Sequence, residues 1–252
     1  MSAGAKRLFG IIGYPLTHSF SEKYFNDKFK ELGLTDVAFK PFSIEDIISI
    51  TQILLEHSNL QGFAITIPHK KAILPFLQET TEDVKTMGAC NCVRIRDGKL
   101  SGFNTDVVGF EQSFIKKLKP HHNKALILGS GGAAAAVEFV LRKLHIDYKF
   151  VSRTKNNGAD NLTYQELTEE IIHNYPVIIN TTPLGTFPKV DDAADIPYHL
   201  LTSNHYLFDL VYNPAETKFL RLGKEQGAAV ENGYEMLVLQ AEENWKIWNE
   251  TN

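Results

Sequence analysis

Three small residues at fixed spacing suggest a binding site for phosphate groups. They are Gly129, Gly131 and Ala134, and they directly follow the apolar run at residues 125–128. In a turn of this kind between a strand and a helix, backbone N–H groups and the helix N-terminus point at one place, where a pyrophosphate can bind. The spacing therefore predicts a dinucleotide site, although a Gly/Ala-rich turn that binds nothing would have the same pattern.

A second predicted strand at residues 148–152 strengthens this interpretation, because it follows the helix at the distance that a βαβ unit requires. Its end indicates which nucleotide binds. NAD sites usually have an acidic residue here for the ribose 2′-hydroxyl, whereas this chain has two cations, Arg153 and Lys155. A guanidinium suits a 2′-phosphate, so the pattern favours NADP. A solvated basic turn is the alternative.

Composition limits the classes of protein to which the chain can belong. Its 252 residues are enough for two small domains, each with its own core. The net charge of −4 gives no electrostatic signature for nucleic acid, and no apolar run approaches the ~20 residues that span a bilayer. We therefore expect a cytoplasmic protein without nucleic-acid or membrane partners.

Cys90 and Cys92 stand too close in sequence for easy bridging and lack the partners of a zinc site, so we expect reduced thiols and no metal.

The N-terminal part alternates apolar strands with amphipathic helices. Hydrophobic periodicity predicts strands at residues 6–12, 37–42 and 60–67 and helices at residues 19–32 and 45–57. This order is a βαβαβ array with a parallel sheet. Ligands bind such sheets beyond the carboxyl ends of the strands, so the residues that follow each strand are the candidates for a site.

Two serines stand at the start of the first predicted helix. Ser19 and Ser21 could both act as caps, and Ser19 with Glu22 has the spacing of a capping box. That explains one serine and not the other. Two hydroxyls beside the free N–H groups of a helix can also bind a carboxylate, because they donate hydrogen bonds where the helix dipole favours an anion.

A lysine follows the third predicted strand. Pro68 ends that strand, which places Lys70 at its carboxyl end. A lone lysine is most simply a solvated charge, and the same holds for Lys71. Further along, Asn104 and Asp106 begin a helix that reaches about residue 118, and either side chain could simply cap it. Because this segment joins the two βαβ arrays, we expect it to line the cleft between them.

The C-terminal part continues the α/β pattern. We predict strands at residues 177–185 and 206–212, a helix at 216–226, and a short strand with a turn at 227–233. The last helix, at residues 234–248, carries an apolar face that we expect to pack rather than to bind a ligand. Its members are Leu237, Val238, Ala241, Trp245 and Trp248.

Short motifs distributed along the chain resemble, in order, those of the shikimate dehydrogenase family. They are Gly13-x-Pro15-x-x-His18-Ser19-x-Ser21, Thr66-Ile-Pro-x-Lys70, Gly88-Ala-x-Asn91, Asn104-Thr-Asp106, Gly129-x-Gly-Gly132, Ser152-Arg-Thr154 and Gly233-x-x-Met236-Leu-x-x-Gln240. The resemblance covers about residues 10–245. It implies an α/β fold with an N-terminal substrate-binding βαβ domain, residues 1–107 and 234–252, which is discontinuous because the C-terminal helix returns to it. Residues 108–233 would form a Rossmann-type NADP-binding domain, with the cleft between the two.

The resemblance also implies which residues form the site. Lys70 and Asp106 would be catalytic. The carboxylate of the substrate would contact Ser19 and Ser21. The ring hydroxyls or the carbonyl of the substrate would contact Thr66, Lys70, Asn91, Asp106 and Gln240. Tyr212 would close over the ring. The cofactor pyrophosphate would contact Gly129, Ser130, Gly131, Gly132 and Ala133, the 2′-phosphate Ser152, Arg153, Thr154 and Lys155, and the nicotinamide end Leu210 and Gly233.

The implied activity is the reversible, NADP-dependent reduction of 3-dehydroshikimate to shikimate in aromatic amino-acid (chorismate) biosynthesis, by a monomer or homodimer with a small-molecule substrate. Hydride delivery to a ring ketone leaves negative charge on its oxygen, which needs a nearby cation or proton donor. Lys70 is suited to that task, and the carboxylate of Asp106 would orient the ammonium group and exchange the proton with it.

This sequence departs from the family pattern at several positions. Ala64 stands where the family commonly has an Asn that reaches a substrate hydroxyl, and Glu22 stands where a Pro is usual. The adenosine motif usually ends in a second Arg, where Asn156 and Asn157 lie here. Losing one hydrogen bond to a hydroxyl costs about 0.5–1.5 kcal/mol, which could relax the choice of substrate without abolishing the chemistry.

Other functions remain open on the sequence alone. Ala64 motivates a relative that also acts on quinate or on an amino analogue of shikimate. A methylenetetrahydrofolate dehydrogenase has a similar layout, but the double serine and the Asn-Thr-Asp motif argue against it. A catalytically silent metabolite or nucleotide sensor could use the same scaffold, because fold does not fix function. A sensor would have no need of Lys70 together with Asp106.

Overall fold

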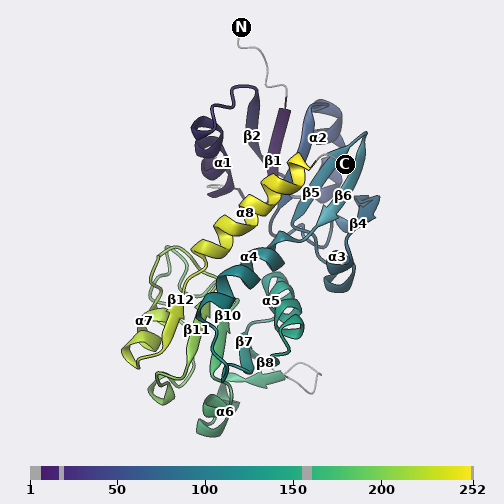
Figure 1. Cartoon of the computed structure of the whole chain (residues 1–252). Coiled ribbons are helices and arrows are strands. Elements are labelled where there is room, and N and C mark those ends of the chain that lie inside the picture. Colours follow the sequence, from purple (N-terminus) through teal and green to yellow (C-terminus); the bar gives the residue numbers. More distant parts are fainter. Residues whose placement is uncertain (1–6, 17–19, 155–160, 251–252) are drawn as a thin grey trace. The chain divides into compact units, whose positions relative to one another are not determined.

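The computed structural model describes residues 7–16, 20–154 and 161–250. The chain divides into two compact units (Figure 1). The first consists of Met1–Thr105 and Ala241–Asn252, and the second of Asp106–Gln240. The chain therefore passes between the units at residues 105–106 and 240–241, compared with 107–108 and 233–234 in the domain boundaries expected from the sequence.

The first unit is built on a six-stranded sheet of order β2-β1-β3-β5-β6-β4. Its strands are β1 (Arg7–Gly13), β2 (Val37–Ser43), β3 (Leu60–Ile65), β4 (Glu79–Thr80), β5 (Cys92–Arg96) and β6 (Lys99–Phe103). β1 pairs in parallel with both β2 and β3, as the βαβαβ pattern predicts. β5 and β6 form an antiparallel hairpin whose turn holds Asp97 and Gly98 at φ 48° and 74°, the left-handed backbone that an Asp-Gly turn adopts.

Helices cover both faces of this sheet. Its helices are α1 (Phe20–Glu31), α2 (Ile50–Glu56) and α3 (Glu82–Met87), with the short 3₁₀ turns η1 (Ile47–Ser49) and η2 (Leu74–Phe76). Buried residues of η1, α2 and α3 pack with one set of strand residues, and buried residues of α1 and of the C-terminal part of α8 (Tyr234–Asn249) pack with the other. Trp248 of α8 is fully buried and stacks on Phe9 of β1 at a ring-centroid distance of 5.0 Å. The apolar face of the last helix thus packs, as expected.

The second unit has a six-stranded sheet of order β12-β11-β10-β7-β8-β9, in which every neighbouring pair is parallel. Its strands are β7 (Lys124–Leu128), β8 (Asp147–Ser152), β9 (Asn161–Thr163), β10 (Val177–Asn180), β11 (Tyr206–Asp209) and β12 (Ala229–Glu231). The apolar runs of β7, β10 and β11 are buried along their length because helices cover both faces of the sheet. The two-sheet structure confirms the predicted α/β class.

The remaining helices of the second unit surround this sheet. They are α4 (Thr105–Phe114), α5 (Gly132–Lys143), α6 (Glu169–Asn174), α7 (Lys218–Glu225) and the beginning of α8, with the 3₁₀ turns η3 (Ile115–Lys117), η4 (Tyr164–Glu166) and η5 (Tyr198–Leu200). Buried residues of α6 and α7 pack in one cluster with β7, β10 and β11. Phe110 and Phe114 of α4 contact Tyr206 and Phe208 of β11 through edge-to-face and stacked ring pairs.

Some elements differ from the prediction. The helix expected at residues 45–57 is split into η1 and α2, because the side chain of Asp46 accepts a hydrogen bond from the N–H of Ile48 and starts a 3₁₀ turn. β3 ends at Ile65 and β10 at Asn180, earlier than expected, since polar and proline-containing loops follow them.

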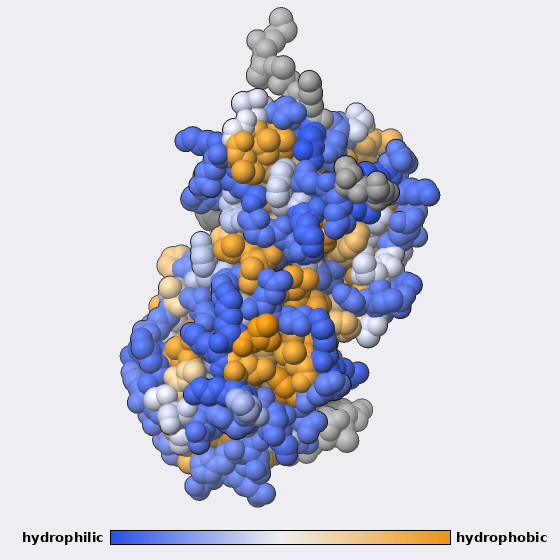
Figure 2. All heavy atoms as spheres, viewed as in Figure 1, coloured by the Kyte–Doolittle hydropathy of each residue, from blue (hydrophilic) through white to orange (hydrophobic). Residues whose placement is uncertain are grey.

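Hydrophilic residues cover most of the face drawn in Figure 2. Among the described helices, none has the length and apolar character needed to cross a membrane.

Candidate active site

The carboxyl ends of β1 and β3 hold two loops of the first unit together. The backbone N–H of Thr66 donates to the carbonyl of Ile12 at 2.9 Å, and that of Tyr14 donates to the carbonyl of Ile67 at 3.0 Å. Thr66 is half-buried and directly follows β3. The structure thus places Thr66 at the edge of the sheet where open α/β sheets bind ligands.

Lys70 lies on the same loop. The carbonyl of Lys70 accepts a hydrogen bond from the N–H of Cys90 at 2.8 Å. The carbonyl of Asn91, the residue after Cys90, accepts one from the N–H of Ile65 at the same distance. These bonds bring the 66–70 loop beside residues 89–91, although the two segments are about twenty residues apart in sequence. The side chain of Lys70 is half-buried. Two of the predicted site residues, Lys70 and Asn91, are therefore neighbours through the backbone.

Asn91 is almost fully buried, at 2% exposure. Its side-chain Oδ1 accepts a hydrogen bond from the backbone N–H of Thr105 at 2.6 Å. Thr105 begins α4 and directly precedes Asp106, which lies half-buried in the first turn of that helix. Asn104 is also buried and donates from Nδ2 to the carbonyl of Ala89 at 3.0 Å. Residues 89–91 and 103–105 are therefore linked by side-chain hydrogen bonds as well as by the sheet.

One of the two predicted contacts of the substrate carboxylate lies at the start of α1. Ser21 is buried in the first turn of this helix, at 7% exposure. Ser19 lies outside the described residues.

Ala64 in β3 is buried within a hydrophobic cluster of the first unit. Ala64 is 5% exposed and belongs to a buried cluster with Cys92, Ala241 and several aromatic rings.

Cys90 and Cys92 are both buried, unbridged thiols, and burial raises the pKa of the Cys92 thiol well above its usual value. Across residues 7–16, 20–154 and 161–250, no group of three His, Cys, Asp or Glu side chains is arranged to hold a metal ion.

The glycine turn of the second unit has the geometry of an anion site. Gly129 adopts φ +95°, and a Cβ there would lie 2.8 Å from Cγ2 of Thr182, so the turn requires glycine. Gly131 is the N-cap of α5 and makes no side-chain cap, while a Cβ on Gly131 or Gly132 would meet only open space. Gly131 and Gly132 are exposed, and the N-cap residue offers no side chain to the first N–H groups of α5, an arrangement that can hold a phosphate.

The neighbouring residues of this turn fit the same role. Ser130 is exposed and Ala133 is half-buried, whereas Ala134 is 2% exposed because it packs the helix on the sheet. The backbone N–H of Gly129 donates to the carbonyl of Val151 at 2.8 Å, which joins the turn to the end of β8.

The predicted 2′-phosphate residues follow at the end of β8. Ser152 is half-buried and donates from Oγ to the carbonyl of Thr154 at 2.6 Å, which closes a tight turn. Arg153 and Thr154 are exposed within that turn. Lys155 lies outside the described residues. Arg153 thus follows β8, the strand next to the one that leads into the glycine turn.

The two residues predicted at the nicotinamide end lie in backbone contact. Gly233 is buried against Leu210 so closely that a Cβ would collide with the Leu210 carbonyl. The N–H of Leu210 donates to the carbonyl of Asn180 at 3.0 Å. Tyr212, two residues further, is 38% exposed, and burial of its remaining surface raises the pKa of its phenol.

Gln240, on α8, belongs to the second unit, not to the N-terminal one in which the sequence-based boundaries placed it. It is 8% exposed, and its Nε2 donates to the carbonyl of Leu237 at 3.0 Å. A Cβ on Gly109 of α4 would lie 3.1 Å from the Cβ of Gln240, so α4 and α8 pack closely at this point.

Sequence reasoning missed a buried polar network at the carboxyl edge of the second sheet. Asp209 is fully buried and accepts hydrogen bonds from Nδ2 of Asn180 at 2.8 Å, from the N–H of Val211 at 3.0 Å and from the hydroxyl of Thr217 at 2.5 Å. Burial raises the pKa of the Asp209 carboxyl to about 6, although these three hydrogen bonds act in the opposite direction. Polar residues at the ends of two buried apolar strands were the available signal.

This network reaches the glycine turn. Oδ1 of Asn180 accepts from both the N–H and the hydroxyl of Thr182, at 3.1 and 2.6 Å. The methyl group of Thr182 is the atom that leaves no room for a Cβ on Gly129. Through Asp209, Asn180 and Thr182, the ends of β7, β10 and β11 are therefore held in one arrangement.

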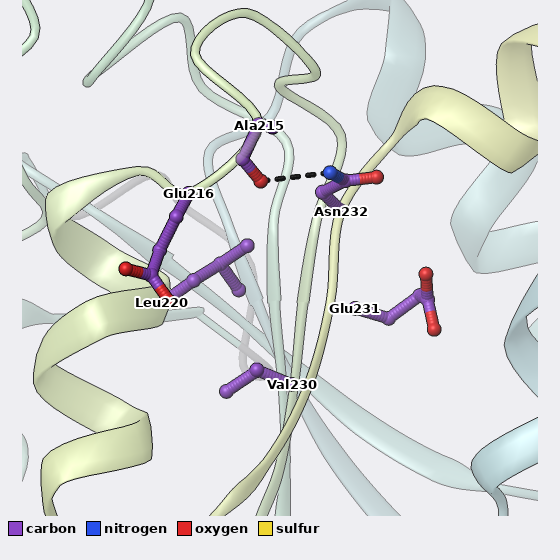
Figure 3. A pocket seen from close by; sticks show the side chains of 6 residues that line it. All are labelled: Ala215, Glu216, Leu220, Val230, Glu231 and Asn232. Atoms are coloured by element: carbon purple, nitrogen blue, oxygen red, sulfur yellow. Dashed lines mark hydrogen bonds between the residues drawn. The ribbon is translucent and has the colours of Figure 1, made fainter.

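A small cavity of about 180 Å³ lies elsewhere in the second unit (Figure 3). It is lined by Ala215, Glu216, Leu220, Val230, Glu231 and Asn232. The two carboxylates point away from each other, and each pairs with a lysine. Two acidic side chains disfavour a phosphate, and no residue predicted for the active site lines this cavity.

Comparisons with known proteins identify the family. A family model described as the shikimate dehydrogenase substrate binding domain matches residues 11–93. A protein of Methanosphaera stadtmanae named shikimate dehydrogenase (NADP(+)) is 32% identical, covering 98% of this chain and 93% of its own. One of the same name from Methanococcus maripaludis is 37% identical, covering 96% and 91%. The chain belongs to the shikimate dehydrogenase family.

A solved shikimate dehydrogenase shares the fold of the whole chain. The enzyme of Thermus thermophilus, in complex with NADP(H) and shikimate, is 28% identical and has a TM-score of 0.84, with coverage of 96% of this chain and 93% of that one. The resemblance to the shikimate dehydrogenase family found in the motifs is thus confirmed. The matched substrate binding domain of the family includes Ser21, Thr66, Lys70 and Asn91 and ends before Asp106.

Proposed function

We propose that this chain catalyses the reversible, NADP-dependent interconversion of shikimate and 3-dehydroshikimate, a step of aromatic amino-acid (chorismate) biosynthesis. The observation that carries the proposal is the nearly full-length similarity to relatives named NADP(+)-dependent shikimate dehydrogenases. The open, uncapped N-terminus of α5 and the cluster of motif residues at the carboxyl edge of the first sheet support it. Both edges are where α/β sheets bind ligands.

The residues at the second edge fit NADP. The N–H groups of Gly129, Ser130, Gly131, Gly132 and Ala133 would hold the pyrophosphate, and Ser152, Arg153, Thr154 and Lys155 would hold the 2′-phosphate. Leu210 and Gly233 would flank the nicotinamide end. When bound, NADP supplies or takes up the hydride.

At the first edge, Ser19 and Ser21 would bind the substrate carboxylate, and Thr66, Asn91 and Gln240 would bind ring oxygens, with Tyr212 against the ring. In the reductive direction Lys70 gives a proton to the ring oxygen as negative charge develops on it. Asp106 would orient the ammonium group of Lys70 and hydrogen-bond the neighbouring hydroxyl. In the oxidative direction the same pair takes the proton from the substrate hydroxyl.

The NADP-binding function would belong to the second unit, and most of the proposed substrate contacts, those of Ser19, Ser21, Thr66, Lys70 and Asn91, to the first. We place the protein in the cytoplasm, in keeping with the expectation from its sequence. We expect a monomer or homodimer. Size-exclusion chromatography with light scattering distinguishes the two states.

The test is absorbance at the NADPH band with the purified protein, in which NADP is compared with NAD and shikimate with quinate. The expected result is fast reduction of NADP by shikimate, with slower rates for the other pairs. Quinate is included because Ala64 provides no hydrogen bond to a ring hydroxyl. A folded protein that reduces neither nucleotide with either acid would contradict the proposal and favour a catalytically silent sensor.

A further inference from the structure

We propose that Thr105 and Asn244 are positioning residues that fix the side-chain amide of Asn91, so that Asn91 donates a hydrogen bond to the substrate and cannot accept one. This inference rests on the proposed function. It concerns three buried side chains of the first unit, since Asn91, Thr105 and Asn244 are 2%, 1% and 1% exposed.

The orientation of the Asn91 amide follows from one hydrogen bond. The backbone N–H of Thr105 can only donate, and it lies 2.6 Å from the side-chain atom of Asn91 that faces it. That atom must therefore be the oxygen Oδ1, because an amide nitrogen in its place would set two donors against each other. The amide nitrogen Nδ2 is then directed to the other side.

The backbone of Asn91 has no freedom to undo this arrangement. Its N–H donates to the carbonyl of Phe103 at 3.1 Å, and its carbonyl accepts from the N–H of Ile65 at 2.8 Å. Both backbone groups are used within the sheet, so the side-chain amide is the part of Asn91 that remains for recognition. Turning the amide over would leave the buried N–H of Thr105 without an acceptor, which carries a large desolvation cost.

The hydroxyl of Thr105 links this amide to α8. Oγ1 of Thr105 lies 2.7 Å from Oδ1 of Asn244 and 3.2 Å from Oδ1 of Asn91. Both oxygens accept hydrogen bonds, and the hydroxyl has only one proton to donate. The shorter contact identifies Oδ1 of Asn244 as its main acceptor. Asn244 thereby holds the rotamer of Thr105 and, through it, the start of α4 that contacts Asn91.

An amide nitrogen in a fixed orientation can recognise only ligand groups that accept a hydrogen bond. None of the described residues accepts a hydrogen bond from Nδ2 of Asn91 in the contacts observed, which leaves this donor for a ligand oxygen. A hydroxyl or carbonyl oxygen can accept from it. An ammonium group at the same place has only donors, so an analogue with an amine at the contacted ring position should bind less well than the hydroxyl compound.

The test is a double-mutant cycle between positions 105 and 91, read as the KM for shikimate. Thr105→Val keeps the shape and the backbone N–H but loses the hydroxyl, and we expect it to raise this KM about 3- to 10-fold, whereas Thr105→Ser restores it. In an Asn91→Ala background, Thr105→Val should change the KM less than about twofold, because its effect acts through Asn91. Asn244→Leu should behave like Thr105→Val.

Two readouts separate positioning from simple loss of packing. The KM for NADP should stay within about twofold of wild type in every Thr105 variant. Ser113→Ala is the matched control, because Ser113 is a fully buried residue of the same helix whose hydroxyl donates only to the carbonyls of Gly109 and Phe110. It should leave the KM for shikimate unchanged.

The outcomes distinguish this inference from the function on which it rests. A wild-type KM in Thr105→Val, failure of Thr105→Ser to restore it, or an equal effect of Thr105→Val with and without Asn91 overturns the positioning role alone. A wild-type protein that does not oxidise shikimate overturns the proposed function and the inference together.

Discussion

The two candidate ligand edges of this molecule are built from different parts of the chain. In the first unit, side chains make the edge, and buried hydrogen bonds among Asn91, Thr105 and Asn244 fix their orientation. In the second unit the backbone makes it, through an uncapped helix N-terminus and a turn at Gly129 that only glycine can adopt. We expect the side-chain edge to discriminate between ligands by hydrogen-bond polarity. The proposed backbone edge would recognise any pyrophosphate and leave the choice of nucleotide to Arg153 and its neighbours.

The largest expected effect lies in the side-chain edge. Lys70→Ala should lower turnover by about 10²-fold or more, because it removes the group that exchanges the proton. The temperature of unfolding should change little, because Lys70 is only half-buried. Initial rates and thermal melts check both parts. Lys71→Ala is the matched control, and near-normal turnover in Lys70→Ala would refute the catalytic assignment.

The backbone edge has its own expected effect. Gly131→Ala should raise the KM for NADP by about tenfold or more, since hydrogen bonds to a charged group contribute about 1.5–3 kcal/mol and the new methyl group would stand in the way of the phosphates. The melting temperature should not change, because a Cβ at residue 131 meets only open space within the protein. By contrast, Gly129→Ala should lower the melting temperature, since φ +95° and the contact with Thr182 both oppose a side chain. Equal melting temperatures for the two variants would contradict this difference.

A smaller effect is expected for the choice of nucleotide. Arg153→Ala should reduce the preference for NADP over NAD by about three- to tenfold, because an exposed charge-assisted hydrogen bond to the 2′-phosphate is lost. The ratio of kcat/KM for the two nucleotides measures it. Arg221→Ala removes an exposed cation on α7 and should leave the ratio unchanged. An unaltered ratio in Arg153→Ala would show that other residues select the nucleotide.

The smallest expected effect is the pH dependence of stability in the second unit. Burial lowers the pKa of His122 and of His205 below 6.5. The unfolded chain therefore binds more protons than the folded chain near and below pH 6.5, so the free energy of unfolding should fall as the pH falls through this range. Asp209 has the opposite effect on the free energy of unfolding. Its pKa of about 6 in the folded chain lies above the ordinary value of 3.8, so the folded chain binds the proton more tightly. The stability that this proton contributes is lost as the pH rises through 6.

The variant Asp209→Asn separates these contributions. Without the titrating carboxyl, the loss of stability between pH 7 and pH 5 should be steeper than in wild type, because the compensating gain from Asp209 is gone. Urea unfolding at several pH values measures the difference. A shallower pH dependence in the variant would contradict the raised pKa of Asp209.

The same difference between the edges explains how much the sequence predicted. Apolar periodicity predicted the longer parallel strands of both sheets. Glycine spacing predicted the turn at residues 129–131, because few residues other than glycine adopt the backbone conformation of Gly129. The Asp-Gly hairpin turn at residues 97–98 is predictable for the same reason. The family motifs then named Lys70 and Asn91, and the structure places both at one edge of the first sheet.

The supporting contacts could not be predicted from the sequence. Thr105 and Asn244 are 139 residues apart, and no local pattern shows that their side chains meet. Asp209 and Asn180 each end an apolar strand, but their mutual hydrogen bond depends on which strands are neighbours in the sheet. Short elements such as β4 and β9 were missed because three or fewer residues carry no periodicity.

The central claim is that the side-chain edge of the first unit binds the substrate and that the glycine turn of the second unit binds the cofactor. The most direct measurement is the pair of KM values, for shikimate and for NADP, in wild type, Asn91→Ala and Gly131→Ala under one set of conditions. We predict that Asn91→Ala raises only the KM for shikimate and Gly131→Ala only the KM for NADP. A rise of the NADP KM in Asn91→Ala, or of the shikimate KM in Gly131→Ala, of the same size as the expected effect would contradict the claim.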